Sequence, residues 1–85
     1  MFRISTEDVN RELTIGTVKK FFPSFAVTTG IGVWKDNIEK SIHFDIVVSN
    51  IEERKRVLQC AEAIRIQNNQ ECVLVIEFST KETFV

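Results

Sequence analysis

The stretch that decides the fold is TTGIGVWKDNIEKSIHFD, residues 28–45. Two runs with alternating apolar residues flank Asp36-Asn37, and Asx residues tolerate the left-handed backbone of a two-residue hairpin turn. With the turn at this dipeptide, Trp34 pairs with Glu39. The sequence therefore predicts two antiparallel strands joined by a tight turn.

The two faces of this hairpin differ in polarity, because successive side chains along a strand point to opposite faces. The face expected to meet the core collects Phe25, Val27, Thr29, Ile31, Val33, Ile42, Phe44, Ile46 and Val48. The other face collects Ala26, Thr28, Gly30, Gly32, Trp34, Glu39, Ser41, His43, Asp45 and Val47. A slip by one residue would bury the ionisable members of the polar face together, so the pattern fixes which face is which.

The elements around the hairpin complete a strand–helix–strand–strand–helix–strand order. Residues 1–5 form a short strand, and residues 6–22 form a helix with its N-cap at Ser5 and Thr6 that Pro23 ends. Residues 51–67 form a helix capped by Asn50. Residues 71–78 form the last strand. The first helix is irregular, and both a continuous helix and one that breaks near Thr14 fit the pattern. The second helix has an apolar stripe made of Val57, Leu58, Ala61 and Ile64.

This order predicts an α+β, ferredoxin-like βαββαβ sandwich. In this fold both helices pack on one face of a four-stranded antiparallel sheet. The expected spatial order of the strands is last, first, third, second. We expect Val47, Val73 and Val75 on the open face. Because an exposed apolar patch indicates a partner, we expect a homodimer that packs through sheet faces or edges.

Length and charge narrow the class of protein. The 85 residues form a single domain, residues 1–85, whose polar end at 79–85 would fray, cover an edge or cross to a partner. The formal net charge is −1 at pH 7, so no long-range field attracts nucleic acid or an anionic membrane. With no membrane span or signal peptide we expect a cytoplasmic protein. Cys60 and Cys72 are then expected to be reduced and buried.

The polar face of the hairpin carries the candidate functional residues. Gly30 and Gly32 weaken a strand unless something approaches the backbone closely. Three alternatives fit this face: an ordinary solvated surface, a dimer contact, or a ligand groove. The candidate ligand- or partner-binding residues are Thr28, Trp34, Glu39, Ser41, His43 and Gln70.

No catalytic, metal or cofactor motif is evident in the sequence. Residues two apart on a strand are spaced about 6.5–7 Å, which argues against a direct nucleophile–base bond between Ser41 and His43. His43 is the only histidine, and neither cysteine is near it in the expected register, so no metal site is predicted. We expect no cofactor, and a small hydrolase or isomerase is the least favoured alternative.

RNA binding has one superficial signal in the third strand, KSIHFDIV, residues 40–47. Lys40 and Phe44 follow the RNP1 frame of RRM domains, which share this topology. Ile42 stands where a second stacking aromatic belongs, and Phe44 points inward in the expected register. Nucleic acid is therefore not an expected partner.

The runs FFPSFAVTTGIGVWKDNIEKSIHFDIVV and NNQECVLVIEF, within residues 21–78, resemble small uncharacterised single-domain proteins of bacteria and phages. The positions that carry the resemblance are Gly32, Trp34, Glu39, Ser41 and Gln70. The resemblance implies a stand-alone domain that acts by binding. For a viral protein it implies either an inhibitor that docks onto a host enzyme or a protein that sequesters a small nucleotide.

The function predicted from these observations is a non-enzymatic, homodimeric binding module that recognises a protein partner. The alternative is a sponge for a small nucleotide with a pocket at the dimer seam. There Trp34 would stack on the base, and polar contacts would come from Thr28, Glu39, Ser41 or Gln70.

Overall fold

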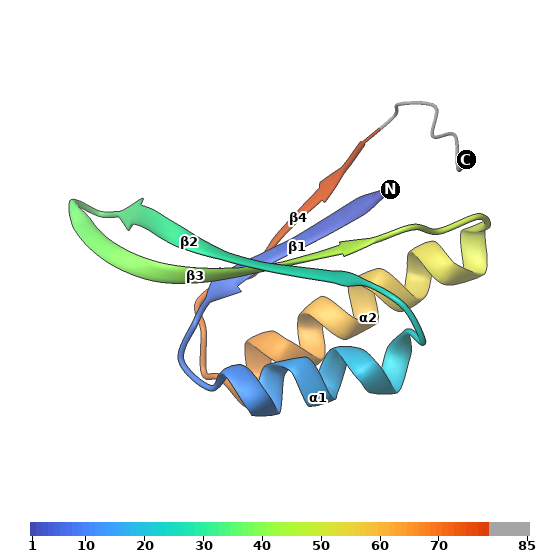
Figure 1. The fold of residues 1–85 in the computed structure, drawn as a ribbon, viewed down its shortest axis with the longest axis horizontal. Coiled ribbons are helices and arrows are strands. Elements are labelled where there is room, and N and C mark those ends of the chain that lie inside the picture. Colours follow the sequence, from blue (N-terminus) through green and yellow to red (C-terminus); the bar gives the residue numbers. More distant parts are fainter. Residues whose placement is uncertain (79–85) are drawn as a thin grey trace.

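The computed structural model describes residues 1–78, which form four strands and two helices (Figure 1). In chain order these are β1 (Phe2–Glu7), α1 (Arg11–Phe21), β2 (Ala26–Trp34), β3 (Asn37–Ile46), α2 (Ile51–Gln67) and β4 (Leu74–Glu77). The strands form one antiparallel sheet in the order β2-β3-β1-β4. The predicted α+β, ferredoxin-like arrangement and its strand order are confirmed. The expected role of residues 79–85 lies outside the described residues.

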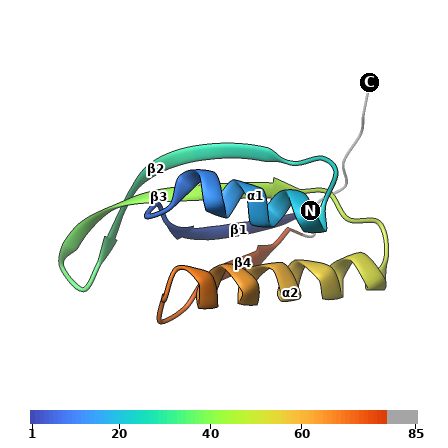
Figure 2. The same ribbon diagram turned by 90° about the horizontal axis from the view of Figure 1, so that it is seen from below.

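Both helices lie on one face of the sheet and leave the other face open (Figures 1 and 2). The core between them is built from β1, the inner half of β3, and one side of each helix. Its buried apolar residues are Phe2, Ile4, Val18, Phe22, Ile42, Phe44, Ile46, Val57, Cys60, Ala61 and Ile64. Phe25 packs edge-on against Phe44, with ring centroids 5.8 Å apart. None of the helices within residues 1–78 has the length and hydropathy that crossing a membrane requires.

Helix α1 is continuous but begins five residues later than expected, at Arg11. Thr6 and Glu7 belong to β1 instead, where they pair with Ile42 and Ser41. The predicted cap at Ser5 and Thr6 is therefore wrong, and Asn10 is the residue that precedes the helix. Pairing with β3 across the sheet outweighs the local capping preference, which contributes only about 1 kcal/mol.

The two helices meet through a polar seam, which explains why α1 lacks a clear apolar stripe. The buried side chains of α1 are Thr14, Thr17 and Val18. Asn68, at the end of α2, donates its Nδ2 hydrogen to Thr14 Oγ1 at 2.9 Å, and the Thr17 hydroxyl donates to Gln67 Oε1.

Helix α2 has the predicted bounds and the predicted cap. Asn50 Oδ1 accepts a hydrogen bond from the backbone N–H of Glu53 at 2.9 Å. The predicted stripe is wrong at one position, because Leu58 is exposed and Cys60 is buried. Burial raises the pKa of the Cys60 thiol to about 12, so this group is protonated at neutral pH. Cys72 is exposed, which contradicts the expectation that both thiols are buried.

The hairpin turn lies one residue earlier than predicted, at Lys35-Asp36. Both residues have positive φ, 49° and 64°, as a type I′ turn requires at its two central positions. Trp34 therefore pairs with Asn37, not with Glu39, whose partner is Gly32. This moves the register by two residues, so every side chain keeps the face that was predicted for it.

The side chains of strand β4 face the opposite sides of the sheet from those expected. Val75 pairs with Ile4, and Ile4 must face the helices because it is part of the core. Val73 and Val75 consequently pack against the core, and Leu74 and Ile76 lie on the open face. The prediction that Val73 and Val75 form an exposed patch with Val47 is wrong. Pairing with β1 decides which side chains of this short strand face the helices.

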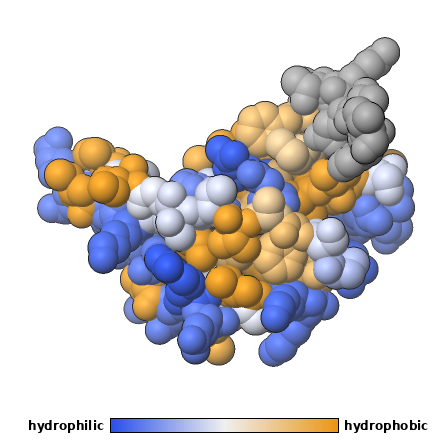
Figure 3. Space-filling view, in the orientation of Figure 1, coloured by the Kyte–Doolittle hydropathy of each residue, from blue (hydrophilic) through white to orange (hydrophobic). Residues whose placement is uncertain are grey.

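The β2–β3 hairpin extends past both helices as an arm (Figure 1). Ile31 and Val33 were expected in the core but are 76% and 72% exposed. Ile38 of β3 lies on the same helix-facing side and is 77% exposed. Figure 3 shows apolar surface at the left end of the molecule, where the arm extends in Figure 1. The alternating pattern was correctly assigned to a face, but the helices are too short to cover the far half of that face.

Candidate active site

The open face of the sheet brings polar side chains into rows across the strands. The pairing of β1 with β3 and of β3 with β2 fixes these rows. They are Arg3–Asp45–Ala26, Ser5–His43–Thr28, Glu7–Ser41–Gly30 and Glu39–Gly32. Five of the six predicted binding residues, all except Gln70, lie on the hairpin part of this face.

His43 is the centre of the site because both of its ring nitrogens have a hydroxyl partner. Nδ1 is 2.7 Å from Ser5 Oγ, and Nε2 is 3.1 Å from Ser41 Oγ. All three side chains are half-buried. The expectation that Ser41 and His43 are too far apart is therefore wrong: it considered the backbone spacing, whereas the imidazole ring reaches along the strand to the serine.

Ser5 is a site residue that the sequence pattern did not reveal. Its place opposite His43 follows from the pairing of β1 with β3, whereas the sequence was interpreted as a helix cap at this position. The available signal was the alternation Phe2-Arg3-Ile4-Ser5, which continues one residue further to buried Thr6. A longer first strand places Ser5 on the polar face of the sheet.

Gly30 leaves the hydrogen bond between Ser41 and His43 open from the side of β2. A Cβ atom at Gly30 would lie 3.5 Å from Ser41 Oγ and 3.6 Å from His43 Nε2. These are ordinary contact distances, so a methyl group fits and a larger side chain would cover the pair. The absence of a side chain thus gives a ligand access to both polar groups.

An ion pair borders the histidine row. Arg3 donates from Nε and Nη2 to the two carboxylate oxygens of Asp45, at 2.7 and 3.1 Å. The hydrogen bond to Asp45 and then the attraction of its charge raise the pKa of Arg3. Asp45 is therefore bound by Arg3, and the ring nitrogens of His43 are bound by hydroxyl groups.

Of the remaining predicted residues, two lie toward the tip of the arm and one lies in a loop outside the arm. Glu39 is half-buried opposite Gly32, and Trp34 is half-exposed at the end of β2. Gln70 is in the loop between α2 and β4, where its Nε2 donates to the carbonyl of Asn68 at 3.2 Å. This bond holds the Gln70 side chain against its own loop, so within residues 1–78 the structure does not bring Gln70 together with the hairpin residues.

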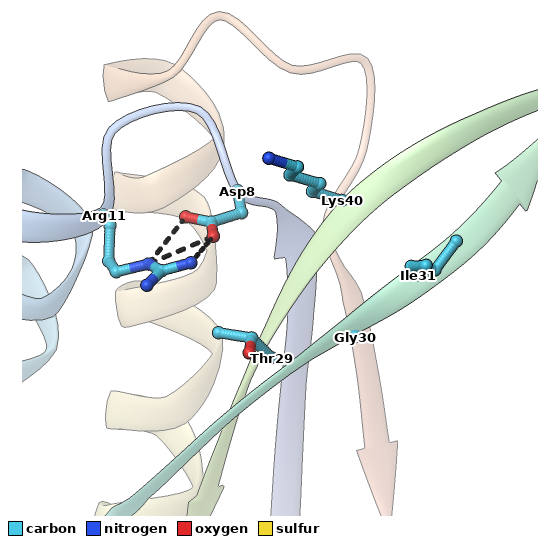
Figure 4. A pocket seen from close by; sticks show the side chains of 6 residues that line it. All are labelled: Asp8, Arg11, Thr29, Gly30, Ile31 and Lys40. Atoms are coloured by element: carbon cyan, nitrogen blue, oxygen red, sulfur yellow. Dashed lines mark hydrogen bonds and ion pairs between the residues drawn. The ribbon is translucent and has the colours of Figure 1, made fainter.

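A shallow depression of about 300 Å³ lies on the helix side of the arm, where β2 and β3 meet the loop before α1 (Figure 4). Its lining consists of Asp8, Arg11, Thr29, Gly30, Ile31 and Lys40. Arg11 is held by Asp8 at 2.5–3.4 Å, and Lys40 points toward this pair. Among the described residues, no group of three His, Cys, Asp or Glu side chains is arranged to hold a metal ion.

Comparison with known proteins gives similarity in structure only, since no protein-family model and no curated protein sequence matches the chain. The chain is similar to a phage SAM lyase in complex with S-methyl-5′-thioadenosine, with a TM-score of 0.65 and 16% identity. That match covers 87% of this chain and 75% of the other. It is also similar to a phage SAM lyase in the apo state, with a TM-score of 0.66 and 15% identity, over 95% of this chain and 90% of the other.

These matches establish the shared fold and correct the predicted function. The expected non-enzymatic binding module, with its nucleotide-sponge alternative, is contradicted because the two similar structures reported above are those of an enzyme. The resemblance to phage proteins is supported at a coarse level, since both similar structures are phage proteins.

Proposed function

We propose that this protein is a lyase that cleaves S-adenosylmethionine on the open face of its sheet. The observation that carries the proposal is the Ser5–His43–Ser41 group, which is reachable past Gly30 on a fold that is also found in a phage SAM lyase. The similarity extends over most of both chains, so the proposal concerns the whole domain.

The ligand of one similar structure indicates which bond would break. S-methyl-5′-thioadenosine keeps the sulfur, its methyl group and the adenosine, so the four-carbon amino-acid fragment is the part that leaves. The electron pair of the broken carbon–sulfur bond goes to the sulfonium, which becomes a neutral thioether. As this bond breaks, the fragment either loses a proton from the next carbon to a base or forms a bond from the carbon that leaves the sulfur to its own carboxylate. Both routes balance without water, as a lyase reaction requires.

The side chains on the arm suit a cationic substrate that carries an aromatic base. The carboxylate of Glu39 would attract the sulfonium and ammonium charges of the substrate. Trp34 offers an indole face for the adenine ring or for the cation. Thr28 and Ser41 would supply hydrogen bonds, and His43 would orient the Ser41 hydroxyl through its Nε2. Gln70 remains a predicted ligand contact from the neighbouring loop, which the Lys35–Glu71 ion pair, at 3.5 Å, connects to the tip of the arm.

The test is to incubate the purified protein with S-adenosylmethionine and to measure methylthioadenosine by mass spectrometry. We expect the product to accumulate and Glu39→Gln to reduce its rate of formation. Lys55→Ala, a charge change on the exposed side of α2, is the control and is expected to be active. The reaction in H₂¹⁸O should leave no ¹⁸O on the carbon that left the sulfur. Absence of product, together with no thermal stabilisation by the substrate, would overturn the proposal.

A further inference from the structure

The two hydroxyl groups on His43 determine where the ring carries its proton. A neutral imidazole has one N–H, so one of its nitrogens donates a hydrogen bond and the other accepts one. With a serine at each nitrogen, one serine must donate to the ring and the other must accept from it. The orientation of the Ser41 hydroxyl therefore depends on the bond that Ser5 makes on the far side of the ring.

The two distances favour one of the two arrangements. Bonds donated by a hydroxyl are shorter on average than bonds donated by an N–H group, about 2.7–2.8 Å against about 2.9–3.0 Å. The bond between Ser5 Oγ and Nδ1 is 2.7 Å long, and the bond between Ser41 Oγ and Nε2 is 3.1 Å long. These lengths favour Ser5 as the donor to Nδ1 and Nε2–H as the donor to Ser41.

We propose that Ser5 is a positioning residue that holds His43 as the Nε2–H tautomer and thereby directs the Ser41 hydroxyl hydrogen toward the substrate. Because Ser41 accepts from the ring, its own hydrogen is available for an oxygen or nitrogen acceptor of the ligand above Gly30. Ser41 is then a hydrogen-bond donor and not an activated nucleophile, because Nε2 has no free lone pair to take its proton. This inference rests on the proposed function for the identity of the ligand, but the tautomer itself does not depend on it.

Within residues 1–78, the charges around the ring come from β1 and β3. Facing the open side are Arg3 and Glu7 of β1, and Asp45 and Glu39 of β3. Arg3 and Asp45 neutralise each other as a bidentate pair. Strand β2 contributes no charged group near the ring, since Thr28 and Gly30 occupy its positions there. The hydroxyl groups therefore remain the direct partners of both ring nitrogens.

The tautomer is measured by ¹⁵N NMR of the imidazole, and the chain has a single histidine, so its signals need no assignment. In the neutral ring, we expect a protonated Nε2 and an unprotonated Nδ1. Ser5→Ala removes the donor to Nδ1, and the two nitrogen shifts should move toward each other as both tautomers become populated. Ser5→Thr keeps a hydroxyl and should restore the wild-type shifts. Ser24→Ala, at an exposed serine before β2, should leave them unchanged.

Kinetics with S-adenosylmethionine provides the second readout. Loss of one oriented hydrogen bond should raise KM about threefold to tenfold in Ser5→Ala, with a smaller change in kcat and recovery in Ser5→Thr. An Nδ1–H ring in the wild-type protein, or unchanged shifts in Ser5→Ala, would overturn the role of Ser5. If the shifts behave as expected but no methylthioadenosine forms, the proposed lyase activity fails and the assignment of the tautomer stands.

Discussion

At the scale of single residues, the site depends on a position that has no side chain. Gly30 stands opposite Ser41 in the sheet, and a Cβ there would meet both Ser41 Oγ and His43 Nε2 at ordinary contact distance. A Cβ at Gly32, two residues further along the same face, would meet no atom within 4 Å. A side chain at Gly30 would therefore cover the Ser41–His43 pair, whereas a Cβ at Gly32 would contact nothing within residues 1–78. The sequence pattern does not distinguish the two glycines.

Gly30→Val should block access to the hydrogen-bonded pair while the sheet remains folded. A β-branched residue suits a strand, and removing a glycine from a strand gains about 0.5–1 kcal/mol, so unfolding should not become easier. We expect formation of methylthioadenosine to fall at least tenfold in Gly30→Val. The same substitution at Gly32 is the comparison and should cause a smaller loss. Equal rates in the two variants would show that Gly30 is not the entrance to the site.

At the scale of elements, the contact between α1 and α2 is unusual because it is partly polar. Thr14 and Asn68 are both buried and share a hydrogen bond of 2.9 Å. Asn68 Oδ1 and Gln67 Nε2 have no hydrogen-bond partner among the described residues. This seam holds the end of α2 against the middle of α1, and it leads directly into the turn before β4.

Thr14→Val should destabilise the protein by about 1–3 kcal/mol, because it leaves the Asn68 amide group buried without an acceptor. The free energy of unfolding is measured by urea denaturation monitored by circular dichroism. The double variant Thr14→Val/Asn68→Leu removes both partners and should recover part of the loss. Additive losses in the two single variants would mean that the hydrogen bond does not couple the helices.

The sequence was informative about elements and much less so about their ends and their contacts. Helix α2 was predicted over its full length because its cap and apolar stripe are local signals. The start of α1 was missed because Thr6 and Glu7 obtain their structure from β3, which is distant in the sequence. Ser5 was missed for the same reason, since its partner is His43. The distance between the Ser41 and His43 side chains was also predicted wrongly from the backbone spacing along the strand. A periodic pattern does not show how far a side chain reaches.

At the scale of the whole molecule, the arm is the part of the fold that the monomer leaves uncovered. Strand β2 is an edge of the sheet, nine residues long, without proline or a charged residue. Long, apolar edge strands are normally protected from pairing with other chains. We propose that a second copy of the chain covers this edge. In a two-fold contact the same surface serves both partners, so Ile31 and Val33 of one copy would meet those of the other.

Ile31→Lys should therefore shift the protein from dimer to monomer, because it places a charge in the centre of the apolar surface. The mass in solution is measured by native mass spectrometry and by light scattering at several concentrations. Ile66→Lys, an equally drastic change at an exposed position on α2, should leave the dimer intact. A monomeric wild-type protein at micromolar concentration would contradict this proposal.

The strand order also has a consequence for how the chain acquires its structure during synthesis. Strand β1 is made first, yet it lies between β3 and β4, both of which are made later. A nascent chain that ends before residue 37 contains β1, α1 and β2 but neither neighbour of β1. Native pairing of the first strand must wait for β3, and its second edge stays unpaired until β4 emerges. Folding is therefore expected to be completed late, as one cooperative event, and shortened translation products should be targets for proteolysis.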